Sequence, residues 1–194
     1  MSSVGFRSIP VAVALAALLL ARNVPAEVFH TRESALHAAF PEADRIESED
    51  WIVSDAEAAE IARRSGSPPG TQLVTAYAAY DGATRLGWAF FDTHVVRTLP
   101  ETLLIALTPE GRVASVRLVA FHEPPEYGPP SRWLSQFDEQ PLSPRLAVDS
   151  DVDGISGATL TARAITASVR RHLALWQVRL PSVGAAPAQP SGAP

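Results

Sequence analysis

The sequence contains no cysteine, and this absence removes several kinds of site at once. Disulfides, thiolate zinc sites, cysteine-ligated iron–sulfur clusters, c-type haem attachment and cysteine nucleophiles all require that side chain. The lipoprotein cysteine that tethers some exported proteins to a membrane is excluded as well. The compartment stays open on this ground alone, because an exported protein need not carry disulfides.

Lysine is also absent, so that all 16 cationic side chains are arginine. The chain also has 21 acidic residues, so its net charge is −5. An acidic chain without a basic run excludes nucleic acid as an expected partner. His30, His37 and His94 are isolated and share no ligand spacing, so we expect no metal site. The hydrophobic fraction of 46% and the charged fraction of 19% are typical of a globular protein.

The N-terminal segment has the pattern of a secretory signal peptide over residues 1–26. Arg7 precedes an apolar run, Ile9 to Ala21, which is shorter than the ~20 residues that span a bilayer. Val24 and Ala26 place small residues at positions −3 and −1 of a cleavage site. The alternative is an uncleaved membrane anchor. We expect cleavage, a periplasmic or otherwise exported protein, and no stable membrane insertion afterwards.

Hydrophobic patterning predicts an α+β fold with an antiparallel sheet. The turn signals Asp81-Gly82 and Thr108 to Gly111 each connect two strand candidates, so the strands pair locally. Ser54 and Glu57 form a capping-box pattern at a helix start. The expected helices are 33–40, 55–64 and 160–178, and the expected strands are 43–53, 72–80, 85–91, 101–107 and 113–121.

Between the last strand and the last helix lies a proline-interrupted stretch, 122–144. Tyr127, Trp133 and Phe137 are its aromatic residues, and such a stretch becomes ordered only by packing on other elements. The segment 181–194 is rich in Ala, Pro, Gly and Ser and is expected to be disordered. We therefore predict a single domain over 27–180.

The segment Asp153 to Thr159 is the most informative in the chain, because small residues with two glycines lead directly into the longest predicted helix. Such a backbone can approach a ligand closely. The helix N-terminus adds unpaired N–H groups and a partial positive charge, which together favour an anion such as phosphate. The alternative is a plain turn in which Ser156 or Thr159 caps the helix.

Gly154, Ser156 and Ala158 also come close to the nucleophile-elbow pattern of α/β-hydrolases. That fold needs a histidine in a loop that returns to the serine. The only later histidine is His172, which lies inside the helix that follows the serine. We therefore exclude a serine hydrolase.

Asp153, Ser156, Gly157, Ala158 and Thr159, followed by Leu160-Thr161, resemble the flavinylation motif of the FMN-binding domain family. This family includes the covalent-flavin subunits of the Rnf complex and of the sodium-pumping NADH:quinone oxidoreductase. The resemblance implies that Thr159 takes FMN from FAD through a phosphoester, formed by a flavin transferase. It also implies that the residues around Thr159 contact the cofactor.

The resemblance extends upstream and covers about 70–176. Arg97 to Leu104 and Pro109 to Val113 resemble the strands that precede the flavin site. His122 to Gly128 occupies the place of a His-x-Glu-Thr-Pro-Gly segment but departs from it, which favours the single-domain exported members. Glu123 is expected to hydrogen-bond the flavin or the backbone, rather than to form an acid–base pair with His122. Tyr127 and Trp133 are candidates for a lid over the flavin ring, with core packing as the alternative.

The resemblance therefore implies an electron carrier that relays electrons between a membrane-associated donor and a periplasmic acceptor. Its partners would be the flavin transferase and redox proteins. Two alternatives remain, a non-redox binding module of the same fold and a flavin-dependent reductase component.

Overall fold

The structure is a computed structural model, and it describes residues 27–28 and 30–180. The predicted signal peptide, 1–26, and the predicted disordered tail, 181–194, lie outside the described residues. Among the helices of the described part, none has the length and apolar character needed to cross a membrane.

The centre of the molecule is a six-stranded sheet in the order β1-β6-β5-β4-β3-β2. Every neighbouring pair is antiparallel, and the predicted α+β fold is confirmed. The strands are β1 (Glu27–Val28), β2 (Arg45–Ile52), β3 (Leu73–Asp81), β4 (Thr84–Val95), β5 (Pro100–Leu107) and β6 (Val113–Phe121).

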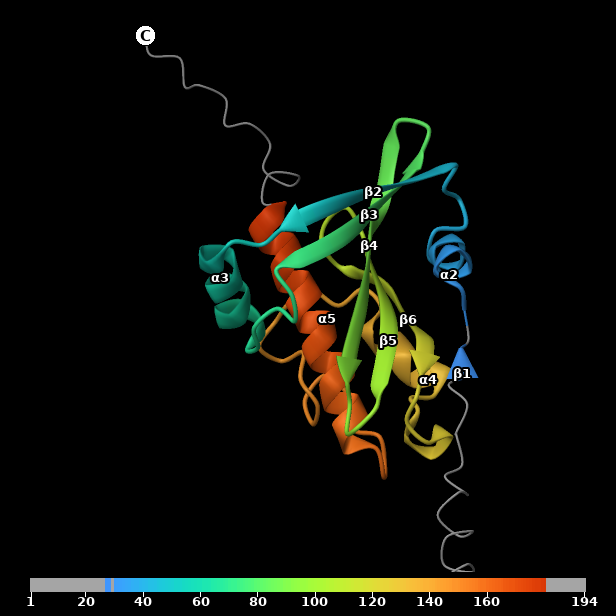
Figure 1. Ribbon diagram of the computed structural model, residues 1–194, viewed down its shortest axis with the longest axis vertical. Helices are drawn as coiled ribbons and strands as arrows, with labels where there is room; N and C mark the ends of the chain where they lie inside the picture. The colour runs from blue at the N-terminus through green and yellow to red at the C-terminus, as the bar shows by residue number, and fades with distance from the viewer. Residues whose placement is uncertain (1–26, 29, 181–194) are drawn as a thin grey trace, which may run out of the picture.

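Helices cover both faces of this sheet (Figure 1). On one face α5 (Thr159–Arg179) packs beside α3 (Asp55–Ser65), and on the other lies α2 (Arg32–Ala39). Residues of β5 alternate between the two cores, with Leu103 and Ile105 towards α5 and Leu104 towards α2. A central strand that is buried on both faces reads as a continuous apolar run.

The first two helices are capped by side chains. Thr31 accepts the N–H of Ser34 at the start of α2. At the start of α3, Ser54 and Glu57 form the predicted capping box, in which each side chain bonds the other residue's backbone N–H. Side-chain oxygens thus satisfy helix N–H groups that would otherwise lack partners.

Strand β4 runs to Val95, beyond the predicted end at Phe91. The polar residues Asp92 and His94 make the sequence resemble the start of a loop. Both are nonetheless shielded side chains, 13% and 16% exposed, because they are paired with partners on β5 and α5. Tertiary ion pairs therefore extend the strand where local polarity predicted its end.

The proline-interrupted stretch folds into short helical turns on the α5 side of the sheet. They are a 3₁₀ turn (Pro125–Tyr127), α4 (Ser131–Leu134) and a second 3₁₀ turn (Ser135–Phe137). Trp133, Leu134 and Phe137 are buried in the main core, so packing orders this stretch. The loop between β4 and β5 and the first turn of α5 lie at the same end of the molecule (Figure 1).

Candidate functional site

Helix α5 begins at Thr159 without a side-chain cap. Its N-cap residue is Ala158, whose methyl group cannot accept a hydrogen bond, and no described side chain takes that role. The alternative in which Ser156 or Thr159 caps the helix is therefore wrong. A helix of 21 residues thus presents free N–H groups and the positive end of its dipole to the surface.

The loop that leads into α5 is fixed by two side chains from the proline-interrupted stretch. The indole N–H of Trp133 donates to the carbonyl of Asp153 at 2.7 Å, and the Oε1 atom of Gln136 accepts the N–H of Asp153 at 2.8 Å. Trp133 itself is buried and packs edge-on against Phe137. Its ring is therefore part of the core, and its polar atom positions the loop.

Gly157 gives the loop its final turn. Its φ is +78°, in the left-handed region that favours glycine, and a Cβ added there would meet no atom within 4 Å. The space above Gly157 is thus open. Thr159 and Leu160 are exposed beside it, whereas Ala158 and Thr161 are buried. The Thr159 hydroxyl is consequently accessible at the start of the helix.

A hollow of about 240 Å³ adjoins this helix start. Arg97 and Tyr127 form one side of it, and Gly157 to Thr161 form the other. The guanidinium of Arg97 lies 4.4 Å from the centre of the Tyr127 ring. The Thr161 hydroxyl donates to the Tyr127 carbonyl at 2.8 Å, so α5 and the aromatic residue hold each other in place.

Glu123 fixes the loop that carries Arg97. Its Oε1 atom accepts the backbone N–H groups of Arg97, Thr98 and Leu99 at 3.0, 2.7 and 2.8 Å. Burial by itself raises the pKa of Glu123, but these three hydrogen bonds outweigh it and hold the pKa below its ordinary value. Of the two roles expected for Glu123, the structure places its carboxylate on the backbone.

A second hollow, of about 420 Å³, lies on the other side of the loop. Trp133, Arg132 and the segment Asp153 to Ser156 line it. The predicted site residues therefore separate into two groups. Tyr127 and Gly157 to Thr161 line the first hollow, and Trp133, Asp153 and Ser156 line the second. Glu123 lines neither hollow and instead binds the backbone of the loop that carries Arg97.

Arg97 was not predicted as a site residue. The sequence signal was slight, since it is an arginine in a short loop between two apolar strands of an acidic chain. Its position beside Thr159 depends on how the β4–β5 hairpin and α5 pack, which no local pattern indicates.

The arrangement of side chains around Ser156 does not support a serine hydrolase. The hollow beside Ser156 has no histidine in its lining. His172 is buried and its Nδ1 atom faces the carbonyl of Ser168 within α5. Within the described part of the chain, no group of three or more His, Cys, Asp or Glu residues is arranged to hold a metal ion.

The residues of this site fit a phosphate-bearing cofactor. An uncapped helix N-terminus and the cation of Arg97 both favour a phosphate anion, and the open space above Gly157 lets it approach the backbone. When bound, FMN would supply redox chemistry that no side chain of this site provides. The chain's part would be to hold the phosphate at Thr159 and the loop of Arg97 beside it.

Comparison with known proteins agrees with this fit. Residues 99–174 match the family model of the FMN-binding domain, a segment that begins in the β4–β5 loop and ends within α5. No curated protein matches the chain. The match over residues 99–174 is to a domain that binds FMN, and it supports FMN as the cofactor of this site.

Proposed function

We propose that the chain carries FMN covalently, through a phosphoester to the hydroxyl of Thr159. The observation that carries the proposal is the exposed Thr159 at the uncapped start of α5, beside Arg97. A phosphodiester keeps one negative charge, which the helix dipole and the guanidinium both favour. The FMN would come from FAD through a flavin transferase. Covalent attachment would retain the cofactor where free flavin is scarce.

The test is the intact mass of the denatured protein after co-expression with a flavin transferase. We expect one FMN increment on the wild-type chain and none on Thr159→Val. Thr84→Val is the matched control, because Thr84 is an exposed threonine at the β3–β4 hairpin, away from α5. An unmodified wild-type chain, or a modified Thr159→Val chain, would contradict covalent attachment at this residue.

We further propose that the flavoprotein is an electron carrier. The hollow at Thr159, about 240 Å³, is smaller than the roughly 300–1,000 Å³ of typical ligand pockets. Such a small, open hollow favours a bound flavin that exchanges electrons with a partner protein over a site that encloses a separate small substrate. Three apolar side chains are exposed and available to a ring or a redox partner: Leu160 in the first turn of α5, Val95 at the end of β4 and Leu99 in the β4–β5 loop.

The carrier would take electrons from a membrane-associated donor and pass them to a periplasmic acceptor. A non-redox binding module would contain no flavin by mass, and a reductase component would turn over quinones or small acceptors. We expect flavin in the purified protein, rapid electron exchange with a partner flavoprotein or cytochrome, and negligible turnover of free quinone. Sustained quinone turnover would favour the reductase instead.

Export to the periplasm is part of the same proposal and depends on the pattern of residues 1–26. Its test is the N-terminal sequence of the protein recovered from the periplasmic fraction, which should begin at Glu27. A chain that begins at Met1 and stays with the membrane would favour the uncleaved anchor.

A further inference from the structure

A connected polar cluster lies between β4, β5 and α5, inside an otherwise apolar layer. The Oδ2 atom of Asp92 accepts hydrogen bonds from Arg171 at 2.9 Å and from Ser168, both on α5. The same oxygen lies 2.9 Å from Nδ1 of His94. On the far side of the ring, Nε2 lies 2.7 Å from Oε1 of Glu101.

The ring of His94 thus separates two carboxyl groups of unequal burial. The His94 side chain is 16% exposed and that of Asp92 is 13% exposed, while Glu101 is fully buried. Protons can therefore reach Glu101 from water only by way of a neighbouring group. His94 is the one neighbour in hydrogen-bond contact with it among the described residues.

The second oxygen of Glu101, Oε2, is buried and has no hydrogen-bond partner among the described residues. A buried acceptor without a partner is costly, and more so when it is charged. Protonation would neutralise this carboxyl group. Glu101 is therefore poised to gain a proton whenever negative charge increases nearby.

The positive and negative charges of the cluster are equal in number. Arg171 and a protonated His94 provide two positive charges against the carboxylates of Asp92 and Glu101. His172, the next titratable residue on α5, is buried, and burial lowers its pKa, so it stays neutral. One added negative charge nearby would therefore leave the cluster one proton short.

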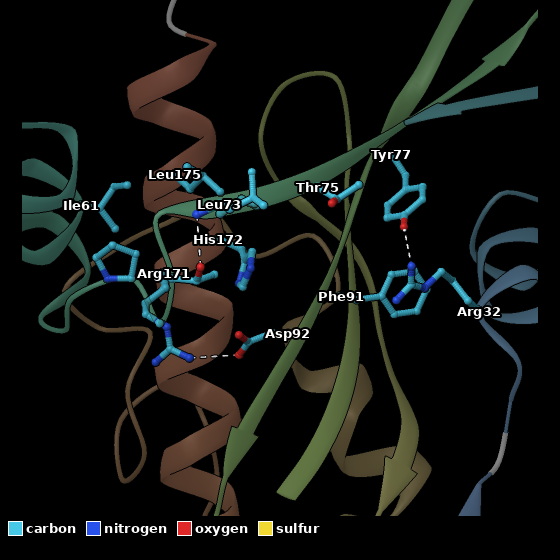
Figure 2. Close-up of a pocket in the computed structure, with 14 residues that line it drawn as sticks. Arg32, Ile61, Leu73, Thr75, Tyr77, Phe91, Asp92, Arg171, His172 and Leu175 are labelled. Atoms are coloured by element: carbon cyan, nitrogen blue, oxygen red, sulfur yellow. Dashed lines mark hydrogen bonds and ion pairs between the residues drawn. The ribbon is translucent and has the colours of Figure 1, made fainter. Parts of the chain in front are cut away.

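Water reaches the outer end of the cluster through a fork in the sheet. Strands β3 and β4 are paired only as far as Ala76 and Phe90, and beyond that point they separate. A pocket of about 180 Å³ lies between them. Figure 2 shows Asp92, Arg171 and His172 along this pocket, with the ion pair of Asp92 and Arg171 drawn as a dashed line.

The inner end of the cluster adjoins the cofactor loop. Glu101 is the second residue of β5 and follows the loop that Glu123 clamps. The negative charge of Glu123 contributes to the raised pKa of Glu101, so a change of charge at this loop acts on Glu101. The cluster therefore connects the fork pocket with the loop whose Arg97 lines the Thr159 hollow.

We propose that His94 and Glu101 form a proton-exchange pair, positioned by Asp92, through which Glu101 takes up one proton from water when the cofactor at Thr159 is reduced. In this step His94 gives its Nε2 proton to Oε1 of Glu101 and keeps the proton on Nδ1. Rotation of the ring towards water then lets Nε2 recover a proton from water. The net change is one proton gained by Glu101, which offsets one unit of negative charge on the cofactor. The proposal rests on the proposed function for the cofactor.

The pKa values of the pair agree with this role. Burial lowers the pKa of His94, but its hydrogen bonds to Asp92 and Glu101 outweigh burial and raise it to about 9. Burial also raises the pKa of Glu101, and the charges of Asp92 and Glu123 add to it, while His94 opposes the rise. Near neutral pH His94 therefore carries the proton that it gives, and Glu101 holds a proton more tightly than a free carboxylate does in water at a pKa of ~4.3.

The experiment is redox-difference infrared spectroscopy on full-length protein whose FMN load has been verified by mass. Reduction should produce the carbonyl band of a protonated carboxyl group, and Glu101→Gln should abolish it. Glu110→Gln, at an exposed glutamate in the β5–β6 turn, should keep it. In His94→Gln, proton uptake followed with a pH dye should slow on the order of 100-fold, the scale of a lost acid–base relay.

Absence of the band in the loaded wild-type protein, or its persistence in Glu101→Gln, would overturn the proposal. If the protein carries no FMN, the proposed function fails and the pair is tested separately. NMR titration of the unloaded chain should then show the His94 ring and the Glu101 carboxyl titrating together. Independent titration of each at its ordinary pKa would overturn the pair even then, and the same measurement decides the question if Glu101→Gln does not fold.

Discussion

The Oε1 atom of Glu123 accepts the backbone N–H of Thr98 at 2.7 Å, across 25 residues of sequence. The same oxygen holds the N–H groups on both sides of Thr98. One buried carboxylate after β6 therefore fixes the whole loop between β4 and β5. Since that loop carries Arg97, the carboxylate also sets where a positive charge lies relative to Thr159.

Replacement of Glu123 by glutamine should destabilise the protein. The amide oxygen can still accept hydrogen bonds, but bonds to a charged acceptor are about twice as strong as bonds to a neutral one. We expect a loss of about 1–3 kcal/mol in the free energy of unfolding, measured by urea denaturation. Glu126→Gln, at an exposed glutamate nearby, is the control. Equal stability of the two variants would contradict the role of Glu123 in holding the β4–β5 loop.

The same carboxylate predicts a loss of stability in acid. The pKa of Glu123 is lower in the folded protein than its ordinary value, so the unfolded chain binds the proton more tightly. Its contribution is present above the unfolded pKa of ~4.3 and is lost as pH falls through the folded pKa. We expect Glu123→Gln to unfold with a shallower dependence on pH below ~4.3 than the wild type. An equal pH dependence of stability in the wild type and in Glu123→Gln below pH ~4.3 would contradict this prediction.

His94 predicts the opposite behaviour in alkali. Its folded pKa of about 9 exceeds the ordinary value of ~6.5. The stabilisation is therefore complete below pH ~6.5 and is lost as pH rises to the folded pKa, by up to about 3 kcal/mol. Thermal unfolding between these two pH values should show this loss in the wild type and in His37→Gln, whose histidine is exposed. It should be much smaller in His94→Gln.

Gly157 and Gly111 form a matched pair, because their φ angles are +78° and +77°. Alanine at either position is strained by about 1–2 kcal/mol in the left-handed region. At Gly157 the added Cβ meets open space, whereas at Gly111 it would clash with the Trp176 ring. Chemical denaturation should therefore show a clearly larger loss for Gly111→Ala. A larger loss for Gly157→Ala would mean that its surroundings are more crowded than described.

Trp133→Phe tests how the attachment loop is held. Phenylalanine keeps most of the buried ring but removes the hydrogen bond to the Asp153 carbonyl. We expect a loss of about 0.5–1.5 kcal/mol in stability and slower FMN loading, because the loop before Thr159 becomes mobile. Trp176→Phe is the comparison, since its indole nitrogen has no hydrogen-bond partner among the described residues. Unchanged loading in Trp133→Phe would contradict the positioning role.

Arg97→Gln tests the cation beside the attachment site. An exposed charge pair contributes about 0.2–1 kcal/mol, so FMN loading should slow by up to about fivefold. Arg45→Gln, at an exposed arginine of β2, removes the same charge away from the hollow. The two variants should differ in loading rate, measured by mass against time. Equal rates would show that Arg97 does not act on the phosphate.

Much of the fold follows from local patterns in the sequence. The capping box of Ser54 and Glu57, the turn at Asp81-Gly82 and the long last helix all depend on residues within one or two turns of each other. Such signals persist in the folded protein, because the interactions behind them are themselves short-range. The end of β4 was misjudged for the opposite reason, since the partners of Asp92 and His94 come from β5 and α5.

The candidate site divides in the same way. The motif from Asp153 to Thr159 was found because its residues are contiguous. The alternative in which Ser156 or Thr159 caps α5 was wrong, because capping depends on the backbone angles of the turn rather than on the presence of a hydroxyl. Ala158 occupies the N-cap position instead.

Three features can be inferred from the order of residues alone: the residue that we propose as the attachment point, the helix that presents it and the absence of any cysteine-based redox group. The surroundings of Thr159 depend instead on how distant segments pack. Arg97 reaches the helix start through the packing of a hairpin, and Glu123 holds that hairpin from more than 20 residues away. Hydrogen bonds at such separations depend on how strands and helices are arranged in space. No periodicity of hydrophobic residues along the chain encodes that arrangement locally.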